Sequence, residues 1–276
     1  MKSLSYQSLV LSPRLSSRLL ALHSGIVYVF LYGPILLLVA LSFNRSPLSA
    51  RWAGFTLDWY GKLLRDTEMI AAAQRSLIVG VGVTMIATVL GTAAALALAR
   101  PAVPARAATN ALLYLPIVIP EIVIGCALLT FFSVTRWELS LWTVGAAHVS
   151  FSLSYVAIVV RARMAGFDRS LEEAAMDLGA SPAATFWRVT LPLIFPGVIA
   201  AALLVFTLSI DDYVITSFVA GTDSTTLPLK IASMVKTGLT PEVNAVSTLL
   251  LGLTMILVWI AQRLLRPPES ARGVHS

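Results

Sequence analysis

Long apolar stretches separated by short polar connections dominate the chain. Six of them reach about 20 residues, the length at which an α-helix crosses a hydrocarbon core of about 30 Å. They lie at 24–43, 76–99, 108–133, 139–160, 193–219 and 243–264. The pattern predicts an all-α integral membrane protein with a bundle of six transmembrane helices. Composition agrees, because 57% of the residues are apolar and only 12% are charged, about half the share of charged residues in a soluble domain.

Basic residues precede the first apolar stretch, as they do in a signal peptide. It runs without interruption from Ser24 to Phe43, however, which is longer than the apolar region of a signal. We therefore predict a retained span and three regions: an N-terminal tail over 1–23, a membrane domain over 24–264 that includes a hairpin at 168–192, and a C-terminal tail over 265–276.

The distribution of Lys and Arg predicts the orientation of these spans. With the N-terminus inside, twelve basic residues fall in the tails and inner connections, and eight fall outside, where most share their loops with acidic residues. Positive charge accumulates on the cytoplasmic side of membrane proteins. Both termini are therefore expected in the cytoplasm.

Several classes of function are disfavoured by the composition. The single cysteine, Cys126, and three scattered histidines supply neither a disulfide nor a metal cluster, and they offer no convergent catalytic group. We therefore predict no metal site, no catalytic residue and no enzyme activity in this chain. The net charge of +6 comes without a dense basic run, so the expected surroundings are membrane lipid and not nucleic acid.

The long outer connection contains the segment GFTLDWYGKLL. Its apolar side chains fall at helical spacing, which predicts a short helix lying in the membrane interface. Trp52 and Trp59 are expected to anchor it at the depth of the lipid headgroups. The face expected to be apolar consists of Trp59, Tyr60, Leu63 and Leu64.

The connection between the fourth and fifth spans has the signals of two short helices. Ser170 precedes Glu173 at the spacing of a capping box, which predicts a helix start. Gly179 suits the left-handed position at a helix end, and Ser181 followed by Pro182 predicts a second start. The result is a cytoplasmic helical hairpin with Phe186 and the adjacent tryptophan as apolar anchors for another protein.

This hairpin resembles the EAA motif of ABC importer permeases. The matching residues are Glu173, Ala174, Ala175, Gly179, Val189, Leu191 and Pro192. The resemblance implies the type I importer fold of six spans, in which this segment couples the permease to a separate ATPase. The chain has no P-loop, since its Gly61–Lys62 pair is followed by Leu63. ATP and Mg are therefore expected in the partner ATPase, and no cofactor in this chain.

Other segments are similar to the polyamine permeases within that family. They are GFTLDWY, LPIVIPEIVIG, SIDDYVITSFVAG, TTLPL and PEVNAVSTL. The resemblance implies a multi-pass protein of the bacterial inner membrane that moves putrescine or spermidine. Its implied partners are a second homologous permease subunit, two ATP-binding subunits and an external polyamine-binding protein. It stays open whether the substrate is putrescine, spermidine or another small organic solute. It also stays open whether the two permeases of the pair are identical.

Three carboxylates fall inside the predicted spans, namely Glu121, Asp211 and Asp212. Each costs about 2.5–3.5 kcal/mol at the centre of a lipid-facing helix, so we expect them to face a cavity or a partner helix. Neighbouring helical residues point about 100° apart. One aspartate is therefore expected to line a path for organic cations and the other to pair across the subunit interface, with Tyr213 or Tyr114 offering a π face to the cation.

Alternative roles for these residues remain open. Glu121 follows Pro120 and is also suited to cap a restarted helix. The two aspartates together are suited to holding two permeases in register, and His148 to interhelical hydrogen bonding. An ion-driven secondary transporter would also use carboxylates within the membrane, but it predicts two similar halves, and we find no such repeat.

Overall fold

The computed structural model describes residues 13–47, 51–99, 106–238 and 240–265, which are helical apart from turns and one isolated bridge between Asn44 and Phe55. The all-α prediction is confirmed. Five helical segments are long and apolar enough to cross a membrane, and a bent pair of helices makes a sixth span if it is taken as one. The long helices are α1 (Pro13–Leu41), α3 (Thr67–Ala99), α6 (Leu141–Met164), α9 (Leu191–Asp211) and α12 (Pro241–Leu265).

The predicted span over 108–133 is a bent pair of helices. It consists of α4 (Arg106–Val118) and α5 (Glu121–Val134), whose axes differ by 108°. Pro120 lies at the break with φ −55° and ψ 136°, an extended conformation outside the helical region. Proline has no N–H to continue the hydrogen-bond ladder and clashes with the preceding turn. The helix therefore stops before Pro120 and restarts in a new direction after it.

The predicted fifth span over 193–219 is also interrupted. Helix α9 ends at Asp211, the backbone of Asp212 is extended, and α10 (Val214–Val219) begins after Tyr213. A further helix, α11 (Leu227–Thr237), has Pro228 in its first turn. The chain thus crosses as far as Asp211 and then continues in short segments.

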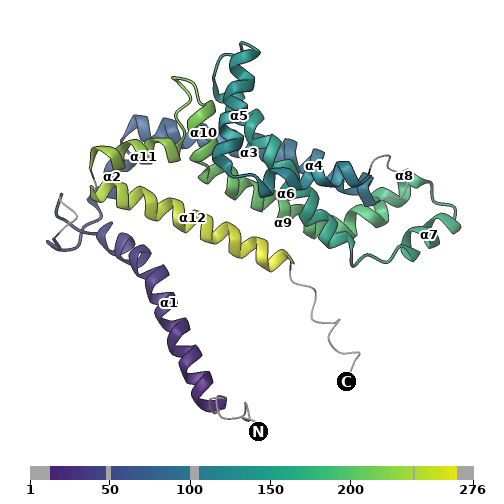
Figure 1. Ribbon diagram of the computed structural model, residues 1–276, viewed down its shortest axis with the longest axis horizontal. Coiled ribbons are helices and arrows are strands. Elements are labelled where there is room, and N and C mark those ends of the chain that lie inside the picture. Colours follow the sequence, from purple (N-terminus) through teal and green to yellow (C-terminus); the bar gives the residue numbers. More distant parts are fainter. Residues whose placement is uncertain (1–12, 48–50, 100–105, 239, 266–276) are drawn as a thin grey trace, which may run out of the picture.

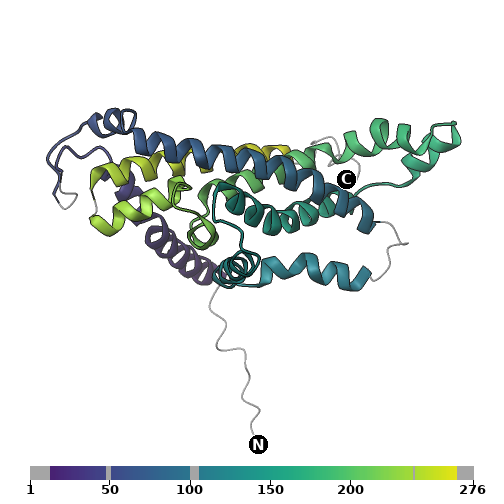
Figure 2. The same cartoon turned by 90° about the horizontal axis from the view of Figure 1, so that it is seen from above.

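The core lies between α3, α6 and α9, which run side by side in Figures 1 and 2. A Cβ atom on Gly91 of α3 would lie 2.5 Å from the Cβ of Val156 on α6, so the absence of a side chain lets these helices approach closely. Helix α12 packs against α9, whereas α1 contacts α12 and diverges from the bundle (Figure 1). No residue in the most apolar part of α1 is buried, which suits a surface covered by lipid or by a partner subunit.

Helix α2 (Asp58–Leu63) differs from the prediction in the face that it buries. Trp59 is buried and its indole Nε1–H donates to the carbonyl of Asn44 at 2.7 Å, so the prediction of Trp59 as an interfacial anchor is wrong. Leu64 is 77% exposed instead of lying on the apolar face, and Trp52 stays exposed. The cluster that encloses the indole contains Leu63, Met69, Ala245 and Val246.

Candidate substrate path and coupling hairpin

A cavity of about 290 Å³ opens where α5, α6, α9 and α10 meet. Four of the five predicted path residues line it: Glu121, Asp211, Asp212 and Tyr213. The fifth, Tyr114, is not part of this lining and lies half-exposed on α4. Carboxylates from two separate helices therefore face one space, an arrangement that attracts cations.

Two aromatic residues in this cavity lie outside the predicted path. Phe151 and Tyr155 on α6 line it, with their rings edge to face and centroids 6.5 Å apart. Their spacing of four residues puts them on one face of the helix, and that spacing was the available signal in the sequence. Together with Tyr213 they give the cavity an aromatic wall that suits a cation–π contact.

The end of α9 directs the two adjacent aspartates into different surroundings. Asp211 is the last residue of the helix and is exposed at the cavity. The side chain of Asp212 is only 6% exposed. The divergence of the two carboxylates was expected from helical rotation, but its structural cause is the change of backbone direction at Asp212.

Asp212 finds its partners within the chain, where we had expected one aspartate to pair across a subunit interface. Its Oδ2 atom accepts from the backbone N–H of Thr216 at 2.8 Å and from the Thr216 hydroxyl at 2.7 Å. It also accepts from Nε2 of His148 at 3.2 Å. The first of these bonds caps the start of α10, because it satisfies an N–H that has no partner inside the helix.

His148 completes this network from α6. It makes interhelical hydrogen bonds, as the sequence predicts. Its Nε2 also lies 2.9 Å from the Thr216 hydroxyl, and its Nδ1 lies 2.8 Å from the Ser209 hydroxyl. With a proton on Nε2 the ring donates to Asp212 and to the Thr216 hydroxyl, and the Ser209 hydroxyl lies within hydrogen-bond distance of Nδ1. The network joins α6, α9 and α10 at the point where the main chain turns.

Glu121 is the first residue of α5 and its exposed side chain makes no capping hydrogen bond. The helix does restart after Pro120, but the capping role considered for Glu121 is not adopted. A carboxylate in the first turn still interacts favourably with the helix dipole. The side chain is left available to the cavity.

The predicted hairpin is present, with one correction at its start. Helix α7 (Ser170–Asp177) begins one residue before the expected position, and Ser170 is not its cap. Asp168 instead accepts from the backbone N–H of Ser170 at 3.0 Å. This bond, with a second from the Ser170 side chain, lowers the pKa of the Asp168 carboxyl below its ordinary value.

The turn of the hairpin follows the prediction. Gly179 has φ +88°, and the next N–H, that of Ala180, reaches back to the carbonyl of Ala175 at 3.0 Å, the pattern of a Schellman motif. Ser181 then caps α8 (Pro182–Thr185) by accepting from the N–H of Ala184. A π-helical turn over Phe186–Thr190 joins α8 to α9, where Pro192 cannot supply an N–H to the preceding turn.

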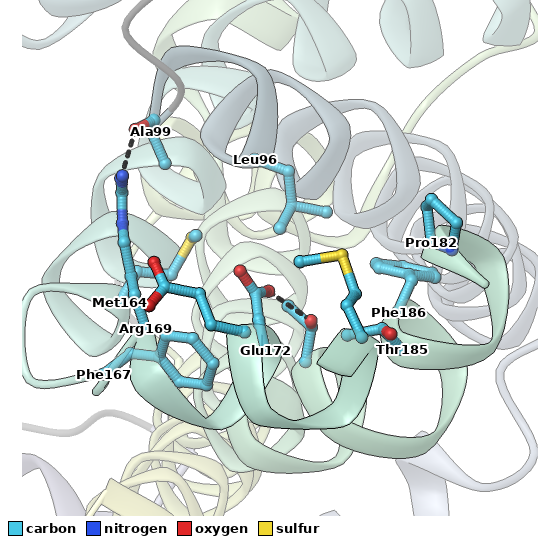
Figure 3. Close-up of a pocket in the computed structure, with 12 residues that line it drawn as sticks. Leu96, Ala99, Met164, Phe167, Arg169, Glu172, Pro182, Thr185 and Phe186 are labelled. Carbon is cyan, nitrogen blue, oxygen red and sulfur yellow. Dashed lines mark hydrogen bonds between the residues drawn. The ribbon is translucent and has the colours of Figure 1, made fainter. Parts of the chain in front are cut away.

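A cavity of about 500 Å³ lies beneath the hairpin, between it and the C-terminal ends of α3 and α6 (Figure 3). Two hydrogen bonds cross this region. The Arg169 guanidinium donates to the carbonyl of Ala99 at 2.6 Å, and the Thr190 hydroxyl donates to Glu172. The hairpin is thereby tied both to the end of α3 and to the start of α9.

The residues that match the EAA motif occupy distinct places on the hairpin. Glu173 and Phe186 line the cavity, and Ala174 lies exposed on α7. Leu191 packs against the main core, whereas Pro192 is exposed. Leu178, at the tip, is 91% exposed and Trp187 is 66% exposed. Both are exposed apolar side chains, of which only Trp187 is an anchor expected from the sequence.

The sequence profile of the binding-protein-dependent transport system inner membrane components matches residues 87–267. The chain belongs to this family. Among the relatives of this permease is the putrescine transport system permease protein PotI of Escherichia coli. It is 42% identical over 254 residues, which cover 89% of this chain and 90% of the relative. The spermidine/putrescine transport system permease protein PotC of Haemophilus influenzae is 40% identical, over 87% and 94% of the two chains.

Solved structures show the same fold at low sequence identity. A chain of a bacterial ABC transporter for the import of alginate matches the permease with a TM-score of 0.72, at 15% identity, over 95% of this chain and 96% of that chain. A chain of the MetNI methionine ABC transporter matches with a TM-score of 0.60, at 18% identity, over 76% and 97%. The permease therefore has the fold of ABC transporter membrane subunits.

Proposed function

We propose that this permease moves polyamines, putrescine or spermidine, through the bacterial inner membrane as one subunit of an ABC importer. The observation that carries the proposal is the cavity in which Glu121 and Asp211 meet an aromatic wall. Polyamines carry ammonium groups separated by methylene chains, and separate carboxylates with apolar surface between them match that chemistry. The names of the relatives PotI and PotC, which are 40–42% identical, support the same substrate class.

The path has to bind weakly as well as selectively. A cation held by several dehydrated carboxylates would leave slowly, and conduction needs sites that release their ligand. Asp211 is exposed, whereas the network with His148 and Thr216 already occupies Asp212. Asp211 is therefore the residue that meets the ammonium group, and Asp212 holds the backbone that presents it.

Transport requires energy that this chain does not supply. We place the hairpin against a separate ATP-binding subunit, which holds ATP and Mg, with Leu178 and Trp187 as the exposed anchors. Two such subunits, a second homologous permease and an external polyamine-binding protein complete the assembly. One structural relative is described in complex with a periplasmic protein, in support of the external partner. The excess of basic residues on the hairpin side supports cytoplasmic termini.

The test is uptake of labelled putrescine and spermidine by the complex reconstituted in vesicles with its binding protein. We expect uptake to require ATP and to fall at least tenfold in Asp211→Asn, since the lost charge interaction is worth up to about 4 kcal/mol at 4 Å and an effective dielectric of 20. Asp58→Asn, in the outer connection, is the matched control and should transport normally. Uptake without ATP would favour a secondary transporter, and ATP-driven uptake of another solute alone would overturn the polyamine assignment.

A further inference from the structure

A second cavity, of about 350 Å³, lies on the other side of the α9 end. It shares Asp211 and Tyr213 with the first cavity. These two residues therefore form a wall between two spaces. The remaining lining comes from α11 (Pro228, Ile231 and Ala232) and from α12 (Ser247, Leu250, Leu251 and Thr254).

Each helix presents a single face to this groove. The lining positions on α12 follow the spacing i, i+3, i+4, i+7 from Ser247 to Thr254, and those on α11 follow i, i+3, i+4 from Pro228. Leu249, on the opposite face of α12, is exposed. The groove is thus a defined space between two helix faces and is distinct from the outer surface of α12.

The two cavities differ in charge. The first has Glu121 in addition to the aspartates. Among the described residues that line the groove, Asp211 is the only carboxylate, and the rest are aliphatic apart from Tyr213 and two hydroxyls. The Thr254 hydroxyl already donates to the carbonyl of Leu250 at 3.0 Å. The groove therefore offers one site for a cation, at its edge, and apolar contact beyond it.

This composition fits an alkyl chain attached to an ammonium group. We propose that the groove between α11 and α12 is a second compartment of the substrate site, which takes the alkyl chain of an organic cation held at Asp211. The proposal rests on the proposed function and adds a selection rule. Short diamines fit between Asp211 and Glu121 in the first cavity, whereas longer ones extend past Asp211 into the groove.

The affinity for a diamine then depends on its chain length, because each added methylene group buries more apolar surface in the groove. Each methylene group that leaves water for an apolar site is worth about fourfold in affinity. Loss of the groove should therefore leave short diamines unaffected and should penalise each additional methylene of a longer one.

The experiment measures inhibition of labelled putrescine uptake by a series of unbranched α,ω-diamines of increasing length, in the reconstituted complex with its binding protein. Leu251→Phe fills the groove, and Leu249→Phe makes the same change on the outer face of α12 as the matched control. Ala232→Leu narrows the groove from α11 and serves as a second variant in case the first fails to assemble. The binding protein is the same in all samples, so its own selectivity cancels between them.

We expect both groove variants to keep putrescine uptake within about twofold of the parent. The inhibition constant of the longest diamines should rise at least tenfold, and Leu249→Phe should follow the parent. An unchanged length profile in both assembled groove variants would overturn the proposal, and so would an equal loss for short and long diamines. Parental uptake is read separately: a complex that moves no polyamine refutes the proposed function, whereas normal putrescine uptake with an unaltered profile refutes the groove alone.

Discussion

Substitutions at Asp211 and Asp212 should separate substrate binding from structural support. In Asp212→Ala the backbone N–H of Thr216, now bonded at 2.8 Å, loses its acceptor and cannot turn away. A buried donor left unpaired costs about 1–3 kcal/mol. His148 keeps its contact with the Thr216 hydroxyl, so the imidazole is not stranded as well. With the lost charge-assisted bonds to the hydroxyl and the ring, the free energy of unfolding should fall by about 3 kcal/mol.

Asp212→Asn should be milder, because its amide oxygen can still accept from Thr216 and its volume is nearly the same. We expect a loss of about 1 kcal/mol, that of one ordinary hydrogen bond. Asp211→Asn should leave stability unchanged, since the side chain is exposed, while it lowers uptake at least tenfold.

The assay is thermal unfolding of the purified complex measured beside polyamine uptake. The unfolding temperature should fall most in Asp212→Ala and less in Asp212→Asn, and it should keep the parental value in Asp211→Asn. An unfolding temperature lowered by Asp211→Asn and unaffected by Asp212→Ala would refute the assignment of support to one residue and binding to the other.

Three further predictions concern the hairpin and the core. Gly179→Val should uncouple ATP hydrolysis from transport, because φ +88° costs a side-chain-bearing residue about 1–2 kcal/mol although no atom lies within 4 Å; Gly166→Val, equally unhindered, is the control, and substrate-stimulated ATPase activity is the measurement. Asp168→Ala should speed amide exchange at the start of α7. The lowered pKa of Asp168 means that its cap contributes above its ordinary value of 3.8 and is lost only as the pH falls below it, so exchange corrected for intrinsic rates should not change between about pH 5 and 8. Gly91→Ala should destabilise the complex by about 1–3 kcal/mol by pushing against the Cβ of Val156 and the carbonyl of Leu153, and Val156→Ala in the same chain should not restore the unfolding temperature, because alanine keeps the Cβ.

Local signals explain which elements the sequence predicts well. Long apolar runs specify membrane helices, because the bilayer sets their length. The turn at Gly179 and the start at Ser181 follow from backbone requirements that few residue types meet. Asp168 and Ser170 are both good caps only two residues apart, and the structure selects Asp168. Residue types alone therefore do not determine which of the two side chains caps the helix.

The break at Asp212 has a different origin. No proline or glycine marks it, and the surrounding sequence continues the apolar pattern of a span. The break is stabilised by His148, 64 residues away in the chain, so its cause is tertiary. Trp59 is a comparable case, because its burial depends on Ala245 and Val246 of α12. Such contacts depend on which helices become neighbours, and apolar periodicity does not specify that.

The position of the break has a consequence for coupling. The helical stretch from Pro182 to Asp211 runs without a gap over 30 residues, which at 1.5 Å per residue is about 45 Å. Its N-terminal end belongs to the hairpin, and its C-terminal end carries the carboxylate shared by the two cavities. The bond from Thr190 to Glu172 fixes α7 to this stretch. We expect a displacement of the hairpin to reach Asp211 through this continuous helical stretch, whose end is held by the network at Asp212.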